Sequence, residues 1–312
     1  MKKIIILITI LLLSCSSGLP MKIFTPKGNV QWKSPYVSGM NGVENIAFDS
    51  KGFMYVTGLK GMIYKIKHDI KSNKGIIVKK VKAGAVCTGI VALKDRLYVA
   101  FQSKKGGDLR GKIYHVTSEL KIKEALTNEI EGLNALLMSS SGKLYFASSN
   151  MSFINPKGYV GVIDINNKES FKKPQKLLVG KMLNGLAFSP DEITLYYTET
   201  TGGLYSFDMN QKTRKLIFEP KGFLQILDDL TVDSKGNIWL CFNSEMSIVK
   251  ISPKGKTAYR FGSLKVPSSC VFGKGPGFSQ KVLYITEFGQ KSRSMTMDGR
   301  GVWAIPVYKL IK

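Results

Sequence analysis

Short runs of β-branched and aromatic residues, separated by turns rich in Gly, Asn, Asp and Ser, make up most of this chain. Apart from the N-terminal segment, the runs lack the 3.6-residue hydrophobic period of an amphipathic helix. Residues 181–200 are typical: an apolar run starting at Asn184 leads to a Ser-Pro-Asp turn and a second run, "LYYTET". This pattern predicts a β-hairpin. It leaves open why a strand that enters a hydrophobic core should begin with an asparagine.

The hairpin unit recurs along the chain, and its first position stays polar. In four copies a polar residue lies eight residues before the turn position: Glu44 before Gly52, Asn134 before Gly142, Asn184 before Glu192 and Asp228 before Gly236. Two divergent copies begin near Thr88 and Ser269. The copies start about 41 to 50 residues apart, which is the period of a four-stranded propeller blade.

We therefore predict an all-β fold: a six-bladed β-propeller with four-stranded blades, forming a single domain over residues 21–312. A third strand can be read after each hairpin, and usually a fourth. The last copy runs out of chain after its third strand. We expect an N-terminal strand within residues 22–32 to pair with the blade containing Trp303 and so close the ring.

The repeated polar positions predict a metal site. First strands line the channel of a propeller, so equivalent positions should converge on one spot around its axis. Glu44, Asn134, Asn184 and Asp228 hold that position, and Asp229 follows directly. Two carboxylates and two amide oxygens form the ligand set of a hard divalent cation, so we expect Ca²⁺, with Zn²⁺ or Mn²⁺ as alternatives. The same residues could instead cap strand ends or bind channel water.

The blades resemble the gluconolactonase–regucalcin and paraoxonase group of six-bladed propellers, which is related to strictosidine synthase-like proteins. "NGLAFSPDEITLYYTET" from Asn184 and "DDLTVDSKGNIWLC" from Asp228 carry the resemblance. It implies that Glu44, Asn184 and Asp228 bind the metal, that Asn134 is an additional ligand, and that Asp229 holds a place that can bind calcium in the paraoxonase branch.

The resemblance also implies a function, a metal-dependent hydrolase of a small lactone or related ester. Asp228 or Asp229 would orient or deprotonate the attacking water. The histidine pair of the paraoxonase branch is not matched, because His68 and His115 fall on predicted third strands. Some relatives share the blades without such a metal. A non-catalytic platform that binds a sugar, a lipid headgroup or a protein is therefore the alternative, and a lyase is a third possibility.

Long loops between second and third strands should form the substrate walls. They supply Arg110, Asn150 and Arg293 as candidate contacts to an anionic or polyhydroxylated ligand. A set of solvated loops would have the same composition.

The N-terminus reads "MKKIIILITILLLSCSS", with Lys2 and Lys3 before an apolar run over residues 4–13. This run is about half the length that spans a bilayer, so it predicts a signal peptide rather than a transmembrane helix. "LLSC" resembles a bacterial lipobox. It implies a signal peptide at residues 1–14, lipidation of Cys15, a tether over residues 15–20, and an exported protein anchored to a bacterial membrane on its periplasmic side or at the cell surface.

The composition limits the partners. A net charge of +24, from 46 basic and 22 acidic residues, suits an anionic membrane surface or envelope polymer, and export makes nucleic acid an improbable partner. Cys87, Cys241 and Cys270 lack C-x-x-C spacing, which argues against a zinc site or a disulfide framework, although one pair could still form. Two histidines are too few for a multi-histidine metal centre. The oligomeric state stays open.

Overall fold

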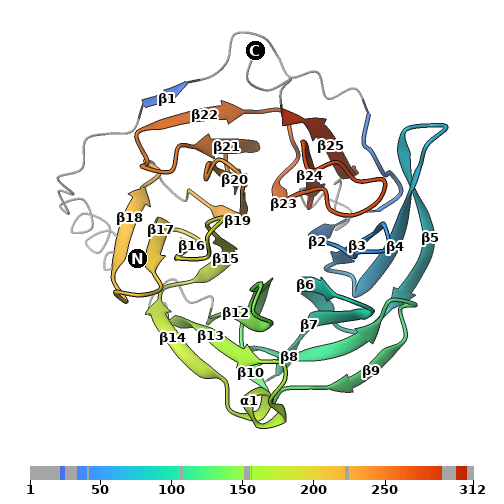
Figure 1. Cartoon of the computed structure of the whole chain (residues 1–312), viewed down its shortest axis with the longest axis horizontal. Helices are drawn as coiled ribbons and strands as arrows, with labels where there is room; N and C mark the ends of the chain where they lie inside the picture. Colours follow the sequence, from blue (N-terminus) through green and yellow to red (C-terminus); the bar gives the residue numbers. More distant parts are fainter. Residues whose placement is uncertain are drawn as a thin grey trace, which may run out of the picture.

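The computed structural model describes residues 22–24, 34–40, 42–105, 108–150, 155, 157–221, 225–289 and 300–307, with the backbone alone for 22–24 and 105. Over these residues the chain forms six β-sheets. Figure 1 shows the sheets as blades around a central axis, with β2, β6, β15, β19 and β23 innermost. The predicted six-bladed β-propeller is confirmed.

Each blade is an antiparallel meander that runs from the channel outward. The first three blades are β2 (Val43–Phe48), β3 (Phe53–Gly58), β4 (Met62–Asp69) and β5 (Lys74–Lys82); then β6 (Val86–Leu93), β7 (Arg96–Lys105) and β8 (Asp108–Thr117), with β9 (Ile122–Ala125) and β10 (Ile130–Glu131) both on β8; then β11 (Leu133–Met138), β12 (Lys143–Ser149), β13 (Gly158–Asp164) and β14 (Gln175–Gly180). The last three are β15 (Leu183–Phe188), β16 (Thr194–Glu199), β17 (Gly203–Asp208) and β18 (Arg214–Phe218); then β19 (Leu227–Val232), β20 (Ile238–Phe242), β21 (Ser247–Ile251) and β22 (Thr257–Phe261); then β23 (Pro267–Phe272), β24 (Val282–Glu287) and β25 (Gly301–Pro306).

The ring closes differently from the prediction. β1 (Lys22–Phe24) pairs in parallel with β22 of the fifth blade, so the expected pairing of this segment with the Trp303 blade is wrong; residues 25–33 lie outside the described residues. The N-terminal segment reaches the sixth blade at Val37, which forms an antiparallel bridge with Val302. Burial explains the position, because Tyr36 and Val37 pack into the core there, whereas β1 only adds to the outer edge of β22.

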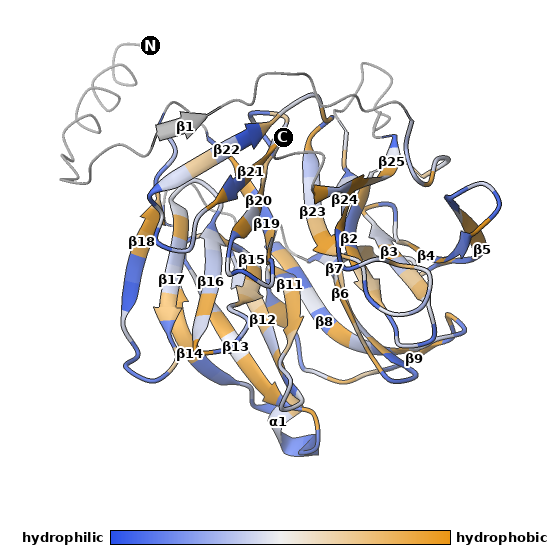
Figure 2. Ribbon diagram, turned by 45° about the horizontal axis from the view of Figure 1, so that its top comes forward, coloured by the Kyte–Doolittle hydropathy of each residue, from blue (hydrophilic) through white to orange (hydrophobic). Residues whose placement is uncertain are grey.

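The core lies between neighbouring blades, where flat aromatic and branched side chains from the middle strands stack. Tyr55, Tyr197 and Trp239 lie on the second strands of three blades and are at most 1% exposed. Figure 2 shows that hydrophilic stretches fall largely on outer strands such as β18 and β22. The alternation of the sequence thus separates blade interfaces from solvent.

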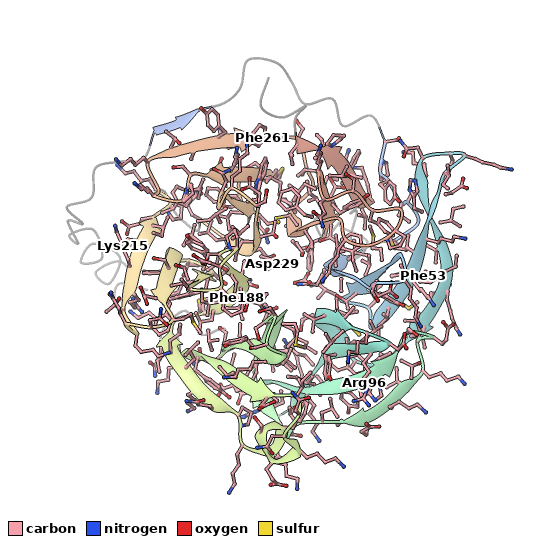
Figure 3. The ribbon with its side chains drawn as sticks, viewed as in Figure 1. Phe53, Arg96, Phe188, Lys215, Asp229 and Phe261 are labelled. Atoms are coloured by element: carbon pink, nitrogen blue, oxygen red, sulfur yellow. The ribbon has the colours of Figure 1, made fainter. Side chains whose placement is uncertain are left out.

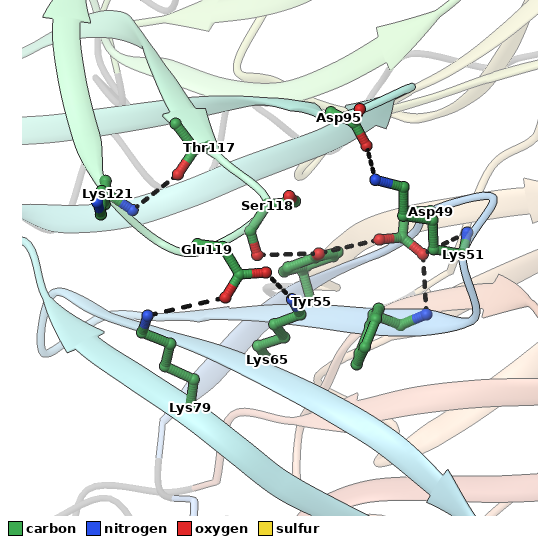
Figure 4. A network of polar contacts seen from close by, with 11 residues as sticks. Asp49, Lys51, Tyr55, Lys65, Lys79, Asp95, Thr117, Ser118, Glu119 and Lys121 are labelled. Carbon is green, nitrogen blue, oxygen red and sulfur yellow. Dashed lines mark hydrogen bonds and ion pairs between the residues drawn. The ribbon is translucent and has the colours of Figure 1, made fainter.

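Polar contacts join adjacent blades at the face that carries the hairpin turns (Figure 4). Asp49 Oδ2 accepts the Tyr55 hydroxyl at 2.9 Å, and this hydroxyl also lies 3.2 Å from the Ser118 carbonyl of the second blade. Nearby, Lys65 Nζ lies 2.6 Å from Glu119 Oε1. The face opposite the predicted ligand site is therefore held by a rigid network.

One short helix, α1 (Lys168–Lys172), belongs to the described part of the chain. Across the residues that the structure describes, no helix has the length and apolar character needed to cross a membrane.

Candidate metal centre and active site

The first strand of every blade carries the same irregularity next to the channel. The pairing of first and second strands shifts between residues 43 and 46, 87 and 90, 133 and 136, 183 and 186, 227 and 230, and 267 and 270. Each shift is a β-bulge, which sets two residues against the partner strand and redirects their side chains. The bulge pairs are Glu44–Asn45, Thr88–Gly89, Asn134–Ala135, Asn184–Gly185, Asp228–Asp229 and Ser268–Ser269. The four predicted ligands occupy the first place of four of these pairs, and Thr88 and Ser268 hold it in the other two.

Three carboxylates from two blades share one end of the channel. Burial raises the pKa of Glu44 well above its usual range, and the charges of Asp228 and Asp229 raise it further. Burial also raises the pKa of Asp228 to about 7 and that of Asp229 to about 6. Figure 3 shows Asp229 on the innermost strand of its blade, at the central opening. This cluster needs protons or a cation to balance its charge.

Two buried oxygen atoms at this cluster have no hydrogen-bond partner. They are Glu44 Oε2 and Asn243 Oδ1. Asn243 directly follows β20, and its Nδ2 donates to Asp228 Oδ2 at 2.8 Å. Buried acceptors without a donor are rare in proteins and indicate a missing cation or water.

The two asparagines of the predicted set lie beside the carboxylates. Asn134 Nδ2 donates to Asn184 Oδ1 at 3.1 Å. Asn184 lies within hydrogen-bond reach of Asp228, whose pKa its amide lowers, against the larger effect of burial. Asn134, Asn184 and Asp228 therefore form one row of polar groups across three blades.

Asp229 lies one residue further along the strand than Asp228, and both of its carboxylate oxygens accept hydrogen bonds. Its Oδ2 accepts from Ser269 Oγ at 2.7 Å and from Asn45 Nδ2 at 3.2 Å, while its Oδ1 accepts from Leu230 N at 2.9 Å. It also lines a chamber of about 430 Å³ that opens on the turn face, with both apolar and polar side chains, such as Phe188 and Glu192, in its walls. Asp229 thus separates the candidate site from that chamber.

The donor types decide which cation the cluster fits. Within the described residues, no group of three or more His, Cys, Asp or Glu side chains could hold a metal ion. A cation here would need the amide oxygens of Asn134 and Asn184 beside the carboxylates of Glu44 and Asp228. Such an all-oxygen set fits a hard cation like Ca²⁺ better than Zn²⁺.

Two of the three predicted substrate contacts make local contacts in their own loops or strands. Arg110, on β8, lies 3.7 Å from Asp108 and lines a separate pocket of about 300 Å³ with Phe101 and Lys112. Asn150 closes its own loop, since its Oδ1 accepts from Lys157 N at 2.8 Å. Arg293 and Cys15 lie outside the described residues.

Both histidines lie away from the carboxylates, as the sequence predicts. His68 Nδ1 is 2.8 Å from the Tyr36 hydroxyl, at the junction of the first and sixth blades. His115 Nδ1 is 3.3 Å from Glu124 Oε1, toward the outside of the second blade.

The sequence reasoning missed several polar groups of the site. Asn45 and Ser269 follow the first bulge position in their blades, as Asp229 does, so the repeat already marked their place. Asn243 gave a weaker signal, an asparagine just after the strand "IWLCF". Nothing in the repeat placed its side chain against Asp228.

Comparison with known proteins agrees with this architecture. A 1.00-probability structural match is a gluconolactonase from Xanthomonas campestris, with a TM-score of 0.65, 17% identity, and coverage of 87% of this chain and 88% of that one. The calcium-binding protein regucalcin from Agrobacterium tumefaciens also gives a TM-score of 0.65, with 13% identity over 92% of this chain and 95% of that one. At these identities the likeness concerns the fold.

Sequence comparison also assigns the chain to a family. An uncharacterized protein of Sulfolobus acidocaldarius is 26% identical over 155 residues, and the match spans about half of each protein: 46% of this chain and 53% of that one. The family described as "SMP-30/Gluconolactonase/LRE-like region" matches residues 67–288, which is more than half of the chain. The chain therefore belongs to the SMP-30/gluconolactonase/LRE-like family.

Proposed function

We propose that this protein is a metal-dependent hydrolase of lactones or related small esters. The observation that carries the proposal is the buried, unpartnered Glu44 carboxylate oxygen, set beside Asp228 at one end of the channel. Membership of a gluconolactonase-like family supports the reaction class.

The residues divide the work of holding a divalent cation. Glu44 and Asp228 would supply its negative charge, and Asn134 and Asn184 would supply neutral oxygens. A cation held there would act as a Lewis acid toward the carbonyl group of an ester. Asn243 keeps the Asp228 carboxylate oriented by donating to its Oδ2.

Asp228 is also the stronger candidate for the group that orients or deprotonates water. Its Oδ2 accepts one hydrogen bond, from Asn243 Nδ2 at 2.8 Å. Asp229 already accepts hydrogen bonds on both oxygens and lies deeper in the channel. We therefore assign Asp229 mainly to support of the site, through Asn45 and Ser269.

The test combines metal binding with turnover on a panel of five- and six-membered lactones, aryl esters and a phosphotriester, with Ca²⁺, Mn²⁺ or Zn²⁺ supplied. Asp228→Asn keeps the shape of the side chain but removes its charge, so cation affinity and hydrolysis should both fall at least about tenfold. His115→Ala, a change outside the channel, should leave both nearly unchanged.

Each result is decisive. Full cation binding and activity in Asp228→Asn would refute the assigned site. Tight cation binding by the unmodified protein without turnover of any ester would favour a non-catalytic binding platform. A large loss in His115→Ala would require a histidine-based mechanism instead.

We further propose that the protein is exported and anchored through Cys15, and that its positive charge draws it to anionic lipid. Cys15→Ala should move the protein from the detergent phase to the aqueous phase of a detergent partition. Wild-type protein that already partitions to water would exclude the anchor.

A further inference from the structure

The Glu44 backbone is held from the neighbouring blade by a buried threonine. Thr286, on β24, lies with its Oγ1 2.8 Å from the Glu44 carbonyl oxygen. Thr286 Oγ1 also accepts the Ser269 N–H at 2.8 Å, within the bulge of its own blade. Ser268 Oγ adds a second contact to the Glu44 carbonyl, at 3.1 Å. The hydroxyl thus joins the sixth blade to the residue that carries the unpartnered carboxylate.

The other acidic candidate ligand has the same arrangement. Thr198, on β16, donates from Oγ1 to the Asp228 carbonyl at 2.8 Å and accepts the Gly185 N–H at 2.8 Å. Like Thr286, it is fully buried. The two carboxylate-bearing residues are therefore fixed by equivalent hydroxyls from the blades that precede them in the ring.

The strand register identifies this position in every blade. It is the second-strand residue that faces the bulge, held by Thr57, Ala100, Ala147, Thr198, Cys241 and Thr286 in blade order. The blades that precede Asn134 and Asn184 carry alanine there, Ala100 and Ala147. The blades that precede Glu44 and Asp228 carry threonine. At this register position a hydroxyl therefore precedes each charged ligand, and a methyl group precedes each neutral one. The Asn134 carbonyl has only a longer contact, 3.5 Å, to Thr88 Oγ1 from the bulge of the second blade.

Electrostatics gives a reason for this distribution. Glu44 and Asp228 repel each other when both are ionised, which is the state that binds a cation. Amide side chains do not repel in this way. A buried hydroxyl that bonds a main-chain carbonyl fixes the strand start without taking up the carboxylate itself.

We propose that Thr286 and Thr198 are positioning residues that hold Glu44 and Asp228 ready for a divalent cation; this inference rests on the metal site of the proposed function. They act through the main chain and touch neither cation nor substrate. Outer supports of this kind typically change metal affinity by about 10- to 100-fold.

Thr127 offers a control within the same fold. It is buried, and its Oγ1 accepts the Ile113 N–H at 3.0 Å in the second blade. Thr57 holds the equivalent register position in the first blade but is not a suitable control. Its Oγ1 accepts the Asn45 N–H at 3.1 Å, so it bonds the peptide group that joins Glu44 to Asn45.

The experiment measures Ca²⁺ affinity by calorimetry, and the melting temperature with and without Ca²⁺, for Thr286→Val, Thr198→Val and Thr127→Val. Each variant loses buried hydroxyl bonds, so the melting temperature without metal should fall in all three. Thr286→Val and Thr198→Val should bind Ca²⁺ at least about tenfold more weakly, and Thr127→Val should change affinity by less than about threefold. Thr286→Ser and Thr198→Ser should restore it, because they keep the hydroxyl.

The outcomes separate this inference from the proposed function. Wild-type affinity in Thr286→Val and Thr198→Val would overturn the positioning role and leave the metal site intact. An equal loss in Thr127→Val would also overturn it, because a general loss of stability would then account for the weaker binding. Unmodified protein that binds no Ca²⁺, Mn²⁺ or Zn²⁺ would overturn both proposals. Binding without ester turnover would remove the hydrolase activity alone.

Discussion

Asn243 donates its amide hydrogen to Asp228 Oδ2 at 2.8 Å, while its own Oδ1 is buried without a hydrogen-bond partner. The side chain therefore makes one of its bonds inside the site and offers a free acceptor beside it. Such an acceptor is costly unless water or a cation uses it. Asn243 thus belongs with the candidate ligands, although it lies just after β20, the second strand of its blade, and they lie on first strands.

We predict that Asn243→Ala weakens Ca²⁺ binding, about tenfold, because Asp228 loses the donor that orients it. Asn237→Ala is a suitable control. Asn237 also bonds an aspartate of the same blade, Asp233 at 2.9 Å, but in the turn on the opposite face. The control should lower stability and leave Ca²⁺ affinity unchanged. Calorimetric titration of both variants decides; equal affinities would remove Asn243 from the site.

Stability without metal should fall as the pH rises from about 4 to 7. In this window the folded protein keeps protons on Asp228 and Asp229, whose pKa values are raised to about 7 and 6, while the unfolded chain has released them. The native state then binds more protons, so the free energy of unfolding decreases with pH. Ca²⁺ favours the ionised carboxylates and should remove this slope. Melting temperatures across the window, with Ca²⁺ and with chelator, test it; identical slopes would contradict the expectation.

Arg300→Ala should be among the most destabilising single changes. The Glu287 side chain is 0% exposed and receives Arg300 Nε at 2.9 Å and Nη2 at 2.5 Å, and Arg300 also lies over the Trp303 ring. Removing one partner of such a buried pair costs about 3–5 kcal/mol, because the other charge stays buried. Lys172→Ala breaks an exposed pair with Glu169 and should cost less than about 1 kcal/mol. Urea unfolding of both variants gives the comparison.

Tyr36 should carry most of the closure of the ring. Its N–H donates to the Val302 carbonyl at 2.7 Å, and its own carbonyl accepts from Gly75 N at 3.0 Å, so it joins the sixth blade to the first. Its ring packs against Tyr284 with centroids 5.2 Å apart. Tyr36→Ala should cost about 3–5 kcal/mol, as for other buried aromatic side chains. Deletion of residues 1–33 should cost less, since it spares Tyr36. Thermal unfolding of both variants gives the comparison. If the deletion lowers the melting temperature more than Tyr36→Ala does, residues before Tyr36 contribute more to closing the ring.

The fold could be predicted from the sequence because its information is local and repeated. Alternating apolar residues, turn signals and a recurring polar position define the same hairpin in each blade. This repetition also set Glu44, Asn134, Asn184 and Asp228 in equivalent places. The segments outside the repeat were harder to predict. Residues 22–24 pair with the fifth blade, and Val37 pairs with the sixth. Burial of Tyr36 and Val37 in the core stabilises this arrangement more than a fourth strand on the sixth blade would.

The details of the candidate site depended on the tertiary structure. Adjacent residues of an ordinary strand point to opposite faces, so the strand pattern alone did not place Asp229 near Asp228. The family resemblance implied this position, and the β-bulge accounts for it. Asn243 and Thr286 reach the site from other strands or blades, through contacts between residues far apart in the chain. Periodicity determines which residues occupy equivalent positions within blades. Contacts between blades decide which of these residues have their main chain bonded by a neighbouring blade and which side chains hydrogen-bond to each other. They also decide which buried carboxylate oxygen has no protein partner and can bind a cation.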